Sequence, residues 1–101
     1  MLEPEIFSPD NDGYNDFISI KYTFDQPGYN MTTKIYNSNG HLVRNLVNNE
    51  YLGTFGSVNW NGIQDDNTKA PIGIYVFYIQ IFYLEVNVKQ YKKTGVLATK
   101  L

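Results

Sequence analysis

The stretch Ile72-Gly73-Ile74-Tyr75-Val76-Phe77-Tyr78-Ile79-Gln80-Ile81-Phe82-Tyr83-Leu84 is the longest apolar run of the chain and the strongest predictor of its fold. Its β-branched and aromatic residues favour a strand over a buried helix. The run is too short for a membrane-spanning helix and contains Gln80, so we expect no membrane span. At about 3.3 Å per residue it would make an unusually long strand, so we expect a bend or bulge inside it.

Shorter strand signals lie on both sides of this run, and no segment shows a convincing helical pattern. The expected strands are residues 6–7, 17–24, 30–36, 41–46, 56–60 and 87–97, with a looser segment at 47–55 and a polar loop at 61–71. Asn39-Gly40 is typical of a type I′ hairpin turn. About seven strands at short spacing predict an all-β fold, an Ig-like antiparallel β-sandwich.

The core of this sandwich should come from the large apolar residues of the expected strands. We expect Trp60 to be the core tryptophan of the sandwich and not an exposed platform that stacks on a ligand. The predicted core consists of Phe7, Ile18, Ile20, Tyr22, Ile35, Leu42, Trp60, Val76, Phe77 and Ile79.

Length and composition indicate one domain, residues 1–101, with 43% hydrophobic residues. The net charge of −2 argues against a nucleic-acid partner, because phosphate binding requires clustered positive charge. The absence of cysteine excludes disulfides and thiolate metal sites. The acidic opening Met1–Glu5 lacks the apolar region of a signal peptide, so we expect the domain to be cut from a longer protein.

Three aspartates surround a glycine just before the first long strand. Asp10, Asp12 and Asp16 flank Gly13 at spacings of two and four residues. One reading is an Asx-rich turn, because Asp and Asn bond to their own backbone and Gly supplies a positive φ. The other is a weak Ca²⁺ site, because Ca²⁺ binds several oxygens in a flexible shell. The two readings are compatible, since an ion could clamp the turn.

The C-terminal part of the chain is basic. After Glu85 it holds no acid, only Lys89, Lys92, Lys93 and Lys100. The simplest interpretation is a solvated strand whose lysines prevent edge-to-edge aggregation.

Catalytic constellations are poorly supported, so we do not expect an enzyme. His41 is the only histidine and follows a turn, which leaves neither a Ser-His-Asp triad nor a His-rich zinc site. Asp65 and Asp66 are adjacent in a polar loop, where two carboxylates rarely face each other across a substrate.

Three blocks together resemble a known family. They are Phe7-Ser8-Pro9-Asp10-Asn11-Asp12-Gly13-Tyr14-Asn15-Asp16, then Ile35-Tyr36-Asn37-Ser38-Asn39-Gly40 with Val43-Arg44-Asn45-Leu46, then Trp60-Asn61-Gly62 through Asp65 to Gly73-Ile74-Tyr75. The ending Lys93-Thr94-Gly95-Val96-Leu97 is similar too. The family is that of the C-terminal Ig-like domains of exported Bacteroidetes surface proteins, the gliding-motility-associated or type IX secretion C-terminal domains. Related domains occur in the flagellar hook-capping protein and behind lamin-tail-like domains. Asn61 and Val86 depart from its pattern, where Asp and a turn Gly are common, which weakens any ligand role for the tryptophan loop.

The resemblance implies a non-enzymatic C-terminal module of a secreted or cell-surface protein, serving sorting, anchoring or spacing. Its implied partners are the upstream domains of a larger protein and the secretion apparatus or cell-surface components. The family would place the basic strand with Lys89, Lys92, Lys93 and Lys100 at the sorting apparatus. The alternative from the residues is a carbohydrate-binding sandwich, in which Tyr75 and Tyr78 would stack on sugars.

Overall fold

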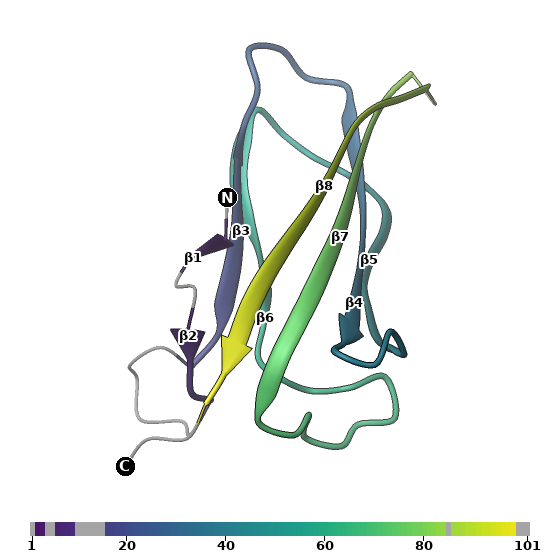
Figure 1. The fold of residues 1–101 in the computed structure, drawn as a ribbon. Coiled ribbons are helices and arrows are strands. Elements are labelled where there is room, and N and C mark those ends of the chain that lie inside the picture. The colour runs from purple at the N-terminus through teal and green to yellow at the C-terminus, as the bar shows by residue number, and fades with distance from the viewer. Residues whose placement is uncertain (1, 4–5, 10–15, 85, 99–101) are drawn as a thin grey trace.

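The computed structural model describes residues 2–3, 6–9, 16–84 and 86–98, and this part of the chain is built from strands (Figure 1). The strands are β1 (Leu2–Glu3), β2 (Ile6–Phe7), β3 (Ile18–Thr23), β4 (Tyr29–Asn37), β5 (Leu42–Tyr51), β6 (Phe55–Trp60), β7 (Gly73–Tyr83) and β8 (Val86–Leu97). Within these ranges there is no helix, and none that could span a membrane. The all-β prediction is therefore confirmed.

Two sheets face each other in a sandwich. The smaller has the order β1-β3-β6 and the larger the order β2-β8-β7-β4-β5. All pairs are antiparallel except β2 with β8, which is parallel. The two short N-terminal strands thus join different sheets, and β1 and β2 lie near each other beside β3 and the end of β8 in Figure 1.

β7 lies at the centre of the larger sheet, with β4 on one side and β8 on the other. Its inward residues Tyr75, Phe77, Ile79 and Ile81 are buried, whereas Ile74 on the outward face is 53% exposed. The register of β7 against β4 is unbroken from Tyr75 to Tyr83. The expected irregularity is a bulge against β8, where Ile81 pairs with Lys89 and Phe82 with Asn87. The extra residue, Val88, therefore lies on β8 and not inside the apolar run.

The core confirms most of the predicted residues. Seven are buried: Phe7, Ile18, Ile20, Ile35, Trp60, Phe77 and Ile79. Tyr22 and Val76 are only partly buried. The prediction was wrong for Leu42, which is 45% exposed because it pairs with Tyr36 on the outward face, while Val43 turns inward. Sequence reasoning missed further buried residues, namely Ser19, Met31, Thr33, Val43, Leu52, Ala70, Tyr75, Ile81 and Leu97.

Two turns differ from expectation. The amide of Gly40 donates to the carbonyl of Asn37, and Gly40 alone in this turn has a positive φ, 82°. That is a type I turn followed by a left-handed glycine, not the type I′ turn that the Asn-Gly pair suggested. The family pattern has a turn glycine at the position of Val86, but Val86 is the first residue of β8. Among the described residues just before it, Leu84 has a left-handed backbone, with φ 50°.

Candidate functional site

Trp60 ends β6 inside the core. Its ring lies 5.6 Å from the ring of Phe7, 5.3 Å from Tyr75 and 5.8 Å from Phe77, measured between centroids. The indole Nε1 donates a 2.8 Å hydrogen bond to the carbonyl of Ile63 in the following loop. Trp60 therefore joins the core to the loop, as expected of a structural tryptophan, and offers no exposed platform.

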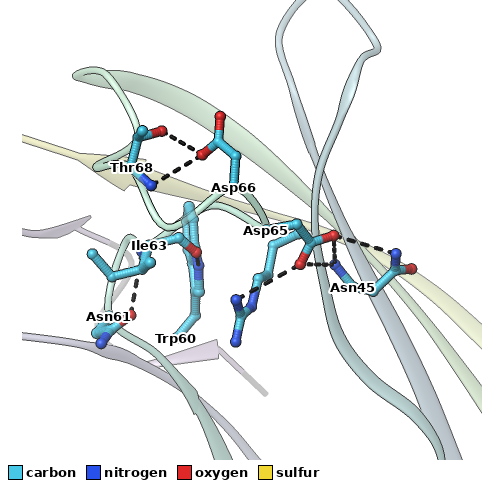
Figure 2. Close-up of polar contacts among 8 residues, drawn as sticks. Asn45, Trp60, Asn61, Ile63, Asp65, Asp66 and Thr68 are labelled. Atoms are coloured by element: carbon cyan, nitrogen blue, oxygen red, sulfur yellow. Dashed lines mark hydrogen bonds and ion pairs between the residues drawn. The ribbon is translucent and has the colours of Figure 1, made fainter.

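The loop after Trp60 is held by its own side chains (Figure 2). Asn61 accepts a hydrogen bond from the amide of Ile63 through Oδ1, at 3.2 Å. Asp66 accepts bonds from both the amide and the hydroxyl of Thr68. These hydrogen bonds favour the carboxylate and hold the pKa of Asp66 below its ordinary value of 3.8.

Asp65 points the other way, toward β5. Its carboxylate accepts bonds from the amide of Asn45, at 3.0 and 3.2 Å, and lies 3.7 Å from the guanidinium of Arg44 (Figure 2). Its own amide donates to the carbonyl of Val43. The adjacent carboxylates of Asp65 and Asp66 thus bind different structural partners, and they do not form the facing pair that glycoside hydrolysis needs.

The predicted basic residues divide between the two faces of β8. Lys89 and Lys93 pair with the inward residues Ile81 and Phe77, whereas Lys92 pairs with the outward Tyr78. All three lysines are exposed, and Lys93 Nζ lies 5.9 Å from the ring centroid of Tyr91. Lys100 lies outside the described residues. The lysines therefore share a strand without forming one flat patch.

A groove that sequence reasoning missed lies between β3 and β8. It has a volume of about 670 Å³ and is lined by apolar, aromatic and charged residues of both sheets. The alternate residues Lys89, Tyr91 and Lys93 of β8, which line the groove, can be seen in the sequence. The sequence alone does not show that β3 lies opposite them.

The predicted calcium turn is described only in part. Asp16 is half-buried two residues before the start of β3, whereas Asp10 and Asp12 lie outside the described residues. Among the residues that are described, no group of three potential metal ligands occurs. The calcium reading therefore stays a prediction.

The two tyrosines named for sugar stacking lie in different environments. Tyr75 is 3% exposed, and its hydroxyl donates to the carbonyl of Pro71, so it is part of the core and cannot stack on a sugar. Burial raises the pKa of its hydroxyl. Tyr78 is half-buried on the outward face and borders a shallow hollow of about 410 Å³ together with Tyr36 and Lys92.

Comparison with known proteins points to one family. The model of the CHU_C type IX secretion signal domain matches residues 1–98. No curated protein matches the chain. A similar solved structure is that of PorZ, described as an essential bacterial surface component of the type-IX secretion system of Porphyromonas gingivalis, with a TM-score of 0.59 and 21% sequence identity. The match covers 97% of this chain and 11% of PorZ, so this chain corresponds to a small part of that protein.

Proposed function

Because this chain belongs to the CHU_C type IX secretion signal domain family, we propose that it is the folded sorting module that directs a larger protein through the type IX secretion system. The observation that carries this proposal is the family match over residues 1–98, which includes every strand of both sheets. The family consists of secretion signals and not of enzymes, and such domains mark proteins that are exported to the cell surface or secreted. A compact sandwich could also anchor or space the domains attached to it.

Within the domain, we assign recognition by the apparatus to β8. Lys89, Lys92 and Lys93 are exposed along this strand, and the described residues include no acid that pairs with them. Unpaired surface charges steer and orient a partner of opposite charge. The same lysines also discourage edge-to-edge aggregation, so their contribution to export has to be measured separately from folding.

The test is export of a reporter. A reporter with a secretory signal at its N-terminus and the whole domain at its C-terminus should cross the outer membrane of a type IX-competent bacterium. Replacing Lys92, Lys93 and Lys100 with Gln should reduce export while the purified variant keeps its melting temperature. Lys69→Gln is the control, because Lys69 is exposed in the loop after β6 and is not a residue of β8.

Two outcomes separate the claims. If the reporter with the unmodified domain stays in the periplasm, the sorting role is wrong. If the triple Gln variant is exported as well as the Lys69→Gln control, the domain sorts but the lysines of β8 do not contribute.

Carbohydrate binding is a second candidate, and the hollow beside Tyr36 and Tyr78 is the observation that favours it. Aromatic rings at a shallow surface can stack on a sugar ring. Glycan-array binding that is lost in Tyr36→Ala and Tyr78→Ala would support it, and absence of binding by the unmodified domain would contradict it. Tyr75→Ala is unsuitable here, because that substitution opens the core.

We also propose that Asp10, Asp12 and Asp16 bind Ca²⁺ weakly. Asp16 lies two residues before the start of β3, so an ion at this turn would tie the N-terminal segment to the first long strand. Extracellular calcium modules typically bind with a Kd of about 10⁻⁴–10⁻³ M.

A further inference from the structure

Within the described chain, one side of the sandwich is open. β1 covers the edge of β3 only at Ser19 and Ile20, and β2 covers the edge of β8 only at Val96 and Leu97. Residues 21–23 of β3 and 86–95 of β8 therefore border the open side without a strand beyond them in the described chain. Figure 1 shows the upper part of β8 extending well past β2. Alternate residues of such an edge direct backbone N–H and C=O groups outward, ready to pair with another strand.

The groove on this side has an apolar interior. Met31, Ile79 and Ile81 form part of its lining from the larger sheet, and Tyr22 and Phe24 line it from the β3 side. Phe24 lies 5.7 Å from Tyr22 and 4.2 Å from Tyr29 of β4, between ring centroids, so aromatic rings continue from the β3 side to the larger sheet. An extended segment lying along the groove would bury part of this surface, which is favourable.

The rim of the groove is positively charged. Among the described residues that line it, Lys21, Lys89 and Lys93 are basic and Asp25 is acidic. Lys89 and Lys93 pair with Ile81 and Phe77 of β7, and Tyr91 between them pairs with Ile79. β8 thus presents a Lys-Tyr-Lys row on the groove side, with alternate residues in between on the outward face.

We propose that the free edge of β8 accepts an extended acidic peptide segment as an added strand. Side chains of the added strand that lie beside Lys89 and Lys93 would be carboxylates, and the one beside Tyr91 would be apolar or aromatic. The recognised pattern is therefore acid-x-apolar-x-acid, where x denotes residues facing away from the groove. Main-chain hydrogen bonds supply affinity in this mode, and alternate side chains supply specificity.

A second copy of this chain is a poor occupant of the same edge. Pairing β8 with another β8 would bring two lysine-bearing strands together, and like charges on neighbouring strands are destabilising. The net positive rim instead selects an acidic partner, although the whole chain carries a net charge of −2.

Peptide binding to the full 101-residue chain tests the proposal. The probe is an acetylated Thr-Glu-Thr-Tyr-Thr-Glu-Thr peptide, and its control replaces both Glu residues with Lys. Calorimetry should detect binding of the Glu peptide and not of the Lys peptide. The affinity for the Glu peptide should fall as the salt concentration rises. Amide hydrogen exchange should slow at alternate residues within 86–95 when the peptide is bound.

Matched variants of β8 locate the site. Lys89→Glu with Lys93→Glu should weaken binding of the Glu peptide about tenfold, because two favourable cross-strand pairs become repulsive. The control variant, Lys92→Glu with Lys34→Glu, makes the same charge change on the outward face. It should weaken binding of the Glu peptide by less than about threefold. Lys89, Lys92 and Lys93 are exposed and Lys34 is partly exposed, so both variants should stay folded.

Several results would overturn the proposal. They are failure of the Glu peptide to bind at millimolar concentration, equal binding of the Lys peptide, equal loss in both variants, and protection on β5 or β6 in place of β8. Dimerisation that protects residues 86–95 without peptide would assign the edge to a second copy. None of these measurements depends on export, so they leave the proposed sorting role to be tested separately.

Discussion

At the scale of single residues, Thr33 is an unusual member of the core. It is fully buried in β4, and its hydroxyl has no hydrogen-bond partner among the described residues. Ser19 of β3 is the other buried polar residue among the described residues, and its hydroxyl donates a 2.6 Å bond to Asn59. A buried polar group without a partner costs free energy, and a methyl group of similar size would not.

We therefore expect Thr33→Val to raise the free energy of unfolding by about 1 kcal/mol. Urea denaturation measures the change. Thr33→Ser is the matched control, because it keeps the hydroxyl and removes the methyl group, and it should lower stability. A destabilised Thr33→Val would mean that the hydroxyl has a partner, such as a buried water, that stabilises the fold.

Asp66 gives a prediction of pH dependence at a single residue. Its folded pKa lies below 3.8 because the carboxylate accepts two bonds from Thr68. The resulting stabilisation is present above the unfolded pKa and is lost as the pH falls through the folded value. An NMR titration of Asp66 should show the low pKa, and Thr68→Ala should raise it. An unchanged pKa in Thr68→Ala, which removes the hydroxyl bond and keeps the amide bond, would show that the hydroxyl bond is not its cause.

At the scale of elements, the loop after β6 depends on Gly62. Gly62 has a φ of 84°, and a Cβ atom there would lie 3.1 Å from Pro9 and 3.2 Å from Leu97. Its carbonyl accepts a bond from the amide of Ala70, which closes the loop. The loop therefore packs closely against Pro9 and Leu97 at this position, which leaves little room for a side chain.

Gly62→Ala should lower the free energy of unfolding by about 1–3 kcal/mol, through the left-handed backbone and the close contacts. Chemical denaturation measures it. Gly53→Ala is the control, because a Cβ atom there would meet nothing within 4 Å and no left-handed φ is required. Equal stability of the two variants would mean that the loop shifts freely to accept the added methyl group.

At the scale of the whole molecule, the N-terminal segment connects the two sheets, since β1 pairs in one and β2 in the other. An ion held by Asp10, Asp12 and Asp16 would tie this N-terminal segment to β3. A ligand that binds only the folded state must raise its stability by mass action.

Calcium should therefore raise the melting temperature of the domain. At about ten times Kd the gain is about 1.4 kcal/mol, which corresponds to a rise of about 5–10 °C for a domain of this size. Thermal unfolding in millimolar Ca²⁺ and in EDTA measures it, with Asp10→Asn and Asp12→Asn as the variant that should lose the difference. Equal melting temperatures in the two buffers would leave these residues only a turn role.

The sequence was enough to predict the fold class and most strand positions, because alternation and β-propensity are local properties. The apolar run 72–84 became β7 at the centre of the larger sheet, and Trp60 became a core residue. The three blocks from Phe7, Ile35 and Trp60 onward were enough to indicate the family, since their order persists along nearly the whole chain.

Only the tertiary structure decided which side chains face the core and where the sandwich stays open. Val43 and not Leu42 turns inward because of the register of β5 against β4, and a shift of one residue exchanges the two faces. The bulge at Val88 likewise sets Lys89 and Lys93 toward the groove and Lys92 away from it. The groove itself arises because β1 and β2 each cover only the end of an edge, and pairing between distant segments is not encoded in any local pattern.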